Sequence, residues 1–214
     1  MGACVEVRCW LYDVSELSDD ATFSRAMECL PWEDRRARVG RYLFQRDQCL
    51  CLGAGLLAAH ALHVAGATDL LMSEGPHGKL RLQRHPDIHF NLSHSGAMAI
   101  CAVASVPVGA DVEELQAYDA SLAAMCFGEG ERCWLGGQPD AGIAFTRLWV
   151  RKESYLKLLG TGLIDGLRAI DVTPGRSDPS RHFWECELPG YALSVCCHEE
   201  MRVTLERATP GFWK

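Results

Sequence analysis

Residues Trp149 to Lys157 read W-V-R-K-E-S-Y-L-K, and the rest of the chain is best interpreted from this stretch. As a helix, it places Trp149, Glu153 and Lys157 at successive i, i+4 positions, so that they share one edge. A carboxylate and an ammonium group one turn apart can form a surface ion pair worth roughly 0.3–0.5 kcal/mol, or they can be half of an active site. The stretch alone leaves both interpretations open.

An acidic pair lies upstream in V-G-A-D-V-E, residues 108–113. The alternation predicts a strand, and a period of two directs Asp111 and Glu113 to the same face. Two carboxylates about 7 Å apart repel each other unless a cation lies between them, and Mg²⁺ is a hard cation that prefers oxygen ligands. Because exposed acidic pairs are common, the D-x-E pattern is a weak signal by itself.

Basic residues concentrate between Arg35 and Arg46, where a helix would make Arg35 and Arg38 neighbours at i, i+3. A solvated basic face is one interpretation. The chain has a net charge of -7, however, so a concentrated positive patch also suggests an anionic ligand such as a phosphate.

Composition excludes several classes of protein. With 214 residues and 48% hydrophobic residues, the chain can form one large domain or two small lobes. Its negative charge argues against general nucleic-acid binding, and no apolar run is long enough to span a membrane. The N-terminus does not resemble a secretory signal, and the eleven cysteines include no C-x-x-C pair. We therefore expect a reduced, cytoplasmic protein.

Periodicity predicts an α+β chain whose two halves meet near Ser105. A buried helix is expected over residues 48–64, and a helical pattern over 118–135 breaks at Phe127-Gly128. Strands are expected at residues 5–13, 88–92, 108–113, 184–188 and 191–197, and the apolar run at 97–104 is expected to be a buried strand or a helix segment.

Three motifs in this order resemble the signatures of the Sfp-type 4′-phosphopantetheinyl transferases: F-N-L-S-H-S-G (90–96), V-G-A-D-V-E (108–113) and the stretch at 149–157. The pairs G-K (78–79) and G-T-G-L (160–163) also resemble that family. The resemblance implies two similar α+β lobes related by a pseudo-two-fold axis, each a small, mainly antiparallel sheet packed with helices. We expect residues 1–105 to form the lobe that contacts the nucleotide of coenzyme A, and residues 106–214 the metal-binding and catalytic lobe.

The resemblance also implies an activity. Such an enzyme moves the phosphopantetheine arm of coenzyme A onto a serine of an apo acyl, peptidyl or aryl carrier protein, and releases adenosine 3′,5′-bisphosphate. We expect a monomer with no nucleic-acid or membrane partner. The carrier remains open, and with it the choice among fatty acid, polyketide and nonribosomal peptide biosynthesis.

By the same resemblance, Asp111, Glu113 and Glu153 are expected to be Mg²⁺ ligands. Glu153 is also the expected base for the carrier serine, directly or through a metal-bound water. Lys157 is expected to stabilise the leaving phosphate, and its charge one turn away would favour an ionised Glu153.

Coenzyme A contacts are expected from a second group of residues: Ser93 and His94 in the serine-histidine motif, Lys79 at the nucleotide, and Arg35 with Arg38 at the 3′-phosphate. Three positions depart from the family pattern, since Leu50 stands where many members carry arginine, Leu80 where proline is common and Ala110 where a branched residue is usual. None of them removes an expected metal ligand.

Two other functions remain alternatives: another Mg²⁺-dependent enzyme of the phosphodiesterase type, and a non-catalytic module that binds carrier proteins. Carrier helices are commonly acidic, so we expect an apolar or basic acceptor surface. Residues 125–134, with Phe127 and Trp134, are a candidate for that surface, and packing of both aromatic side chains in the core is the alternative.

Overall fold

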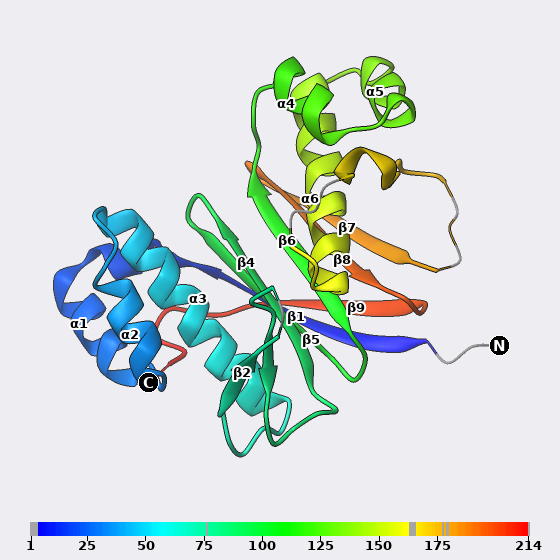
Figure 1. Cartoon of the computed structure of the whole chain (residues 1–214). Helices are drawn as coiled ribbons and strands as arrows, with labels where there is room; N and C mark the ends of the chain where they lie inside the picture. The colour runs from blue at the N-terminus through cyan, green and yellow to red at the C-terminus, as the bar shows by residue number, and fades with distance from the viewer. Residues whose placement is uncertain (1–3, 76, 163–165, 177, 179, 214) are drawn as a thin grey trace.

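The protein consists of β-sheets with α-helices packed against them, as a computed structural model of the chain shows (Figure 1). The structure describes residues 4–75, 77–162, 166–176, 178 and 180–213. Its first half contains β1 (Val5–Asp13), α1 (Asp20–Cys29), α2 (Glu33–Val39), α3 (Gln45–Val64), β2 (Met72–Glu74), β3 (Leu80–Leu82), β4 (His89–Ser95) and β5 (Met98–Ala104). Its second half contains β6 (Val108–Glu114), α4 (Ala120–Cys126), α5 (Glu129–Gly136), α6 (Ala141–Leu159), β7 (His182–Leu188), β8 (Tyr191–Cys197) and β9 (Met201–Arg207).

The first sheet has the strand order β4-β5-β1-β9, and α3 packs against it. The α3 helix is apolar almost all round, which is the pattern of a helix buried between other elements. Gly53 allows a close approach, because a Cβ at this position would lie 2.4 Å from Cγ1 of Val14. The predicted buried helix is therefore present and begins three residues earlier than expected.

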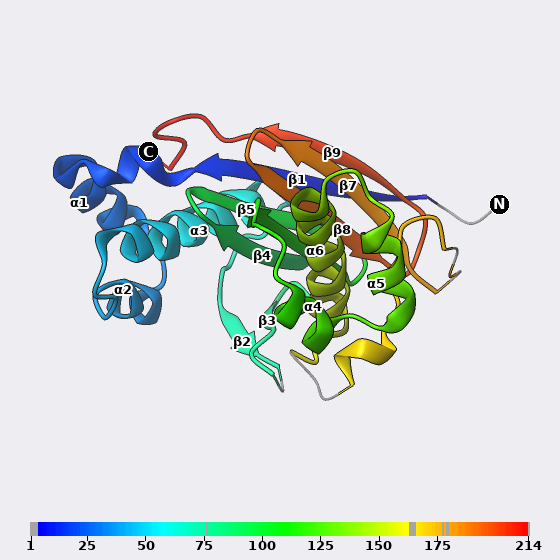
Figure 2. The ribbon, with the colours of Figure 1, turned by 90° about the horizontal axis from the view of Figure 1, so that it is seen from above.

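The second sheet has the order β6-β8-β7, is antiparallel, and is covered by α6. The helix lies directly on β6, because Gly109 has no side chain to separate them. A Cβ on Gly109 would stand 1.9 Å from the carbonyl oxygen of Ser154. Seen from above, α1 to α3 lie at one end of the molecule and α4 to α6 at the other, with strands between them (Figure 2).

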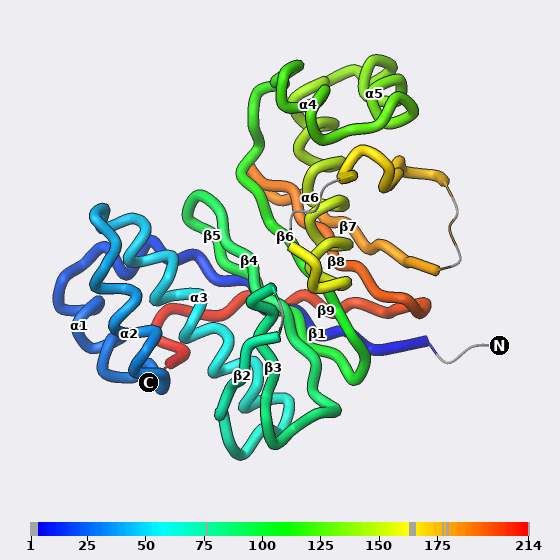
Figure 3. The backbone as a smooth tube through the Cα atoms, in the orientation of Figure 1, coloured from blue at the N-terminus to red at the C-terminus, as the bar shows by residue number. Residues whose placement is uncertain are grey.

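The last strand returns to the first sheet. After β8 the chain crosses over, and β9 pairs in parallel with β1, from Val5 opposite Met201 to Leu11 opposite Arg207. The backbone tube shows this return (Figure 3). Periodicity analysis did not identify β9. The expected α+β class, with small and mainly antiparallel sheets packed against helices, is confirmed, while the lobe division at residue 105 and the pseudo-two-fold relation stay predictions.

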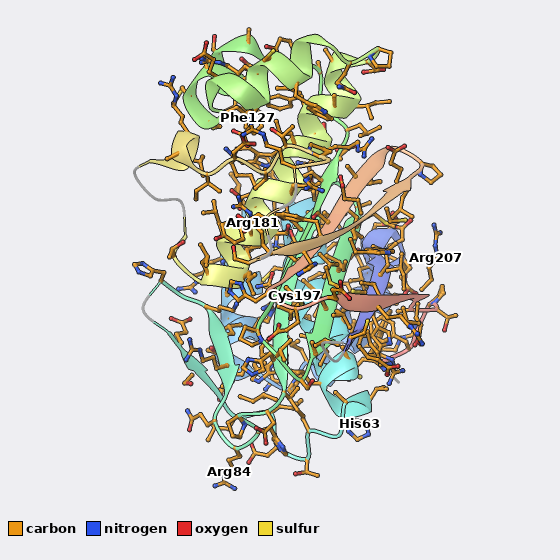
Figure 4. The ribbon with its side chains drawn as sticks, turned by 90° about the vertical axis from the view of Figure 1, so that its right-hand side faces the viewer. His63, Arg84, Phe127, Arg181, Cys197 and Arg207 are labelled. Atoms are coloured by element: carbon orange, nitrogen blue, oxygen red, sulfur yellow. The ribbon has the colours of Figure 1, made fainter. Side chains whose placement is uncertain are left out.

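The expected helix break at Phe127-Gly128 separates α4 from α5. Phe127 is fully buried, so the core-packing alternative holds for this side chain. Its ring packs edge-on against Phe145, with centroids 5.6 Å apart, and lies under the ammonium of Lys152. Figure 4 labels Phe127 beside the helices at the top of the view. Trp134 is half-buried, whereas Met125 is 72% exposed.

Candidate active site

Side chains of β4 reach across to β6 and join the two sheets. Ser93 Oγ donates a 2.6 Å hydrogen bond to Asp111 Oδ1, and Ser95 Oγ donates one of 2.6 Å to Glu113 Oε2. The two serines share one face of β4, and the two carboxylates share one face of β6, as the strand period requires. The acidic pair is therefore held by a neighbouring strand instead of facing open solvent.

The α6 helix brings Glu153 and Lys157 to the same place. Lys157 Nζ lies 2.5 Å from Asp111 Oδ1 and donates a 2.8 Å hydrogen bond to Ser93 Oγ. These groups line a cavity of about 430 Å³. We name it the carboxylate cavity; its lining residues are Arg35, Arg38, Tyr42, Cys51, Leu80, Leu92, Ser93, His94, Asp111, Glu113, Trp149, Glu153 and Lys157.

Burial is the main influence on the three carboxylates. It raises the pKa of Asp111, although the Lys157 ammonium and the Ser93 hydroxyl oppose this shift. It likewise raises the pKa of Glu113 and of Glu153, and the negative charge of Asp111 adds to both shifts. Lys157 does lower the pKa of Glu153, as expected from the sequence, but burial outweighs it. A divalent cation among the carboxylates would relieve this repulsion.

The donor set fits a hard metal ion. Asp111 is almost fully buried, and its Oδ2 has no hydrogen-bond partner within the described residues. A buried, unpaired carboxylate oxygen is costly without a cation or a donor, and carboxylate oxygens are the ligands that Mg²⁺ takes. Within the same residues, however, no three His, Cys, Asp or Glu side chains already form a metal-binding group.

Two arginines line the same cavity as the carboxylates. Arg35 and Arg38, both on α2, line the carboxylate cavity and also an adjoining cavity of about 330 Å³, which we name the arginine cavity. Arg35 Nε donates to the carbonyl oxygen of Cys51 at 3.1 Å, and this bond fixes the guanidinium against α3. The guanidinium groups of Arg35 and Arg38 suit an anionic ligand, because guanidinium groups bind anions through paired hydrogen bonds.

His94 lines the carboxylate cavity together with these charged groups and is exposed to solvent. Partial enclosure lowers its pKa, and the positive charges of Arg35 and Lys157 lower it further. A neutral imidazole is therefore favoured until an anion enters the cavity and offsets those charges.

Lys79 is the one expected contact that lies outside both cavities. Its ammonium donates to three backbone carbonyl oxygens, those of Val108, Lys157 and Leu158. Burial, followed by the charge of Arg81, lowers the pKa of Lys79 to about 8. The structure therefore brings eight of the nine predicted site residues to the carboxylate cavity, whereas the Lys79 side chain lies outside it and contacts the backbone carbonyl oxygen of Lys157.

Sequence reasoning missed two residues of β4 that support the site. Ser95 holds Glu113, and the Oδ1 of Asn91 accepts a 2.9 Å hydrogen bond from the backbone N–H of Ala110. Part of the signal was available, because Asn91, Ser93 and Ser95 are spaced two residues apart and share a polar face once the strand continues past its predicted end at Leu92.

A cavity lined by both carboxylates and arginines suits an enzyme that handles a phosphate-bearing substrate. Comparison with known sequences is specific: residues 107–206 match the 4′-phosphopantetheinyl transferase superfamily. The chain is 34% identical to the 4′-phosphopantetheinyl transferase psf-1 of Bacillus pumilus over 179 residues, covering 76% of this chain and 77% of that protein.

Other relatives agree. The chain is 32% identical to 4′-phosphopantetheinyl transferase Sfp of Bacillus subtilis over 180 residues, which cover 76% of this chain and 80% of that protein. It is 33% identical to the L-aminoadipate-semialdehyde dehydrogenase-phosphopantetheinyl transferase of Eremothecium gossypii, over 77% of this chain and 63% of that protein. The chain belongs to the 4′-phosphopantetheinyl transferase superfamily, and the Sfp-type prediction is confirmed. No helix in the described ranges is long and apolar enough to cross a membrane.

Proposed function

We propose that this protein transfers the 4′-phosphopantetheine arm of coenzyme A to a serine hydroxyl of an apo carrier protein and releases adenosine 3′,5′-bisphosphate. The observation that carries the proposal is the carboxylate cavity, which is lined both by Asp111, Glu113 and Glu153 and by Arg35 and Arg38. The activity printed in the names of the relatives supports it.

The carboxylates of Asp111, Glu113 and Glu153 would hold Mg²⁺. When bound, the ion supplies positive charge to the pyrophosphate of coenzyme A. The Asp111 Oδ2 atom, which is buried without a partner, supports this assignment.

Glu153 would take the proton of the carrier serine, directly or through a metal-bound water. Burial raises its pKa, which makes it a stronger base than an exposed glutamate once it is ionised. The serine oxygen then bonds to the phosphorus that carries the pantetheine arm, and the bond from that phosphorus to the oxygen of the second phosphate breaks. Lys157 donates to the departing phosphate, a role that requires its ammonium to shift from Asp111 towards the substrate.

Arg35 and Arg38 would hold the nucleotide end of coenzyme A. Arg35 and Arg38 extend into the arginine cavity, where a 3′-phosphate could accept paired hydrogen bonds. Ser93 and His94 line the same cavity as the carboxylates and arginines, and an anion there would offset the charges that lower the pKa of His94.

The acceptor surface is proposed on α4 and the segment before it. Tyr118, Leu122 and Met125 are exposed apolar side chains there, with Met125 the most exposed at 72%. An apolar patch of this kind suits the apolar side of a carrier helix. We also propose a cytoplasmic monomer; all eleven cysteines lie in the described part and are free thiols, which is usual in a reducing compartment.

The test is to incubate the protein with coenzyme A, Mg²⁺ and several apo carrier proteins, and to measure the mass of each carrier by mass spectrometry. A carrier should gain the mass of phosphopantetheine. Asp111→Ala should abolish the gain, while Glu114→Ala, an exposed position two residues beyond Val112 on the same strand, should keep it. No gain on any carrier contradicts the proposal, and release of adenosine bisphosphate without a carrier would instead indicate a hydrolase.

A further inference from the structure

Two glycine-containing motifs, G-K at residues 78–79 and G-T-G at 160–162, meet in space although about 80 residues separate them in sequence. The ammonium of Lys79 donates to the carbonyl oxygens of Lys157 at 2.6 Å, Leu158 at 2.9 Å and Val108 at 3.3 Å. Lys79 therefore touches the end of α6 and the first residue of β6 at once.

The two helical carbonyls are the kind that need an outside partner. The last four C=O groups of an α-helix have no partner within the helix, and they form its negative end. A lysine ammonium carries three N–H donors, and all three of those in Lys79 are used here. Any hydrogen bond from this ammonium to a nucleotide would have to replace one of them.

Gly160, at the end of α6, leaves room for the side chain of Lys79. Gly160 adopts the left-handed conformation, with φ of 68°, that ends many helices. A Cβ at this position would lie 3.0 Å from Cδ of Lys79. The aliphatic part of Lys79 therefore packs against Gly160 while its ammonium caps the carbonyls, so two independent contacts fix it.

We propose that Lys79 is a positioning residue, which ties the last turn of α6 to the start of β6. The proposal rests on the proposed function, because the connection between α6 and β6 affects activity only if both elements carry site residues. The α6 helix carries Glu153 and Lys157, and β6 carries Asp111 and Glu113. Lys79 fixes the distance between the α6 pair and the β6 pair by holding the two elements together, and it does not contact the substrate.

The test compares Lys79→Met with Arg81→Met, which removes a nearby exposed cation from β3. Hydrogen exchange is measured without coenzyme A, by mass spectrometry. Lys79→Met should speed exchange of the amides at 157–160 about tenfold and lower kcat at least tenfold, whereas Arg81→Met should do neither. Exchange at the wild-type rate, together with a change only in KM for coenzyme A, would show that Lys79 is a nucleotide contact and would overturn the proposal.

The exchange readout needs no enzymatic activity, so it separates this proposal from the proposed function. Faster exchange in a protein that modifies no carrier would leave the tie standing and refute the transferase. If Lys79→Met does not fold, acetylation of the wild-type protein by an amine-reactive ester decides. Lys79 should be protected relative to the denatured chain even without coenzyme A; protection that appears only when coenzyme A is added would overturn the proposal.

Discussion

Replacing Lys152 by methionine should lower the free energy of unfolding by about 3–5 kcal/mol, because it would leave a buried carboxylate without its counter-charge. Lys152 and Glu131 are both fully buried, and Lys152 Nζ lies 2.7 Å from Glu131 Oε2. The same ammonium donates to the carbonyl oxygens of Cys126 and Leu167, at 3.0 and 3.1 Å. One side chain thus connects α6 to the end of α4, to α5 and to the segment before β7.

The magnitude follows from what the substitution leaves behind. Glu131 would keep two hydrogen bonds, from the backbone N–H groups of Gly128 at 2.8 Å and Val172 at 3.1 Å. These bonds stabilise the carboxylate but do not neutralise it. The double variant Lys152→Met, Glu131→Gln removes the charge and retains an amide oxygen as acceptor. It should therefore lose less stability than the sum of the two single variants.

The assay is urea denaturation followed by tryptophan fluorescence and circular dichroism, with a shared m-value. Arg147→Met is the matched control on the same helix. Its ion pairs with Glu185 and Glu187 are longer, at 3.6 and 3.4 Å, and partly exposed, so it should cost about 1 kcal/mol or less. The reasoning is refuted if Lys152→Met is no less stable than Arg147→Met.

Three further predictions concern the carboxylate cavity. Ser95→Ala removes the 2.6 Å bond to Glu113, so Mn²⁺ binding measured by calorimetry should weaken about tenfold; unchanged binding would show that Ser95 does not orient Glu113. Gly109→Ala forces α6 away from β6, because the new Cβ would meet the Ser154 carbonyl, and should cost about 1–3 kcal/mol in thermal unfolding together with most of the activity. A variant as stable as the wild type would contradict that packing. The pKa of His94 is lowered by enclosure and nearby cations, so its NMR titration should reach the charged form only below the usual pH, and adding adenosine 3′,5′-bisphosphate should move the midpoint upward. A midpoint that the nucleotide leaves unchanged would place the phosphates elsewhere.

The sequence predicted best those features that depend on local period. Asp111 and Glu113 share a face because a strand alternates, and Glu153 and Lys157 share an edge because a helix repeats. These rules need no knowledge of the rest of the chain. They bring the carboxylates and Lys157 within reach of one another once α6 lies on β6.

Features that depend on partners far along the chain could not be predicted in this way. Period alone shows that a strand has a polar face, but not which strand it meets, so the bond from Ser95 to Glu113 was missed. The aromatic ring of Phe127 looked available for a partner because its burial depends on Lys152 and Phe145 from another helix. The destination of Lys79 was likewise set by carbonyl groups about 80 residues away.

The return of β9 to β1 has a consequence for how the protein is made. During synthesis on the ribosome, β1 emerges before the other strands described here, yet its parallel partner β9 emerges after all of them. Until then one edge of β1 presents unpaired N–H and C=O groups, which attract other chains. Pairing so distant in sequence also slows folding. We therefore expect the nascent chain to need shielding by a chaperone at this edge, and a fragment ending at residue 105 to aggregate unless a peptide containing β9 is supplied.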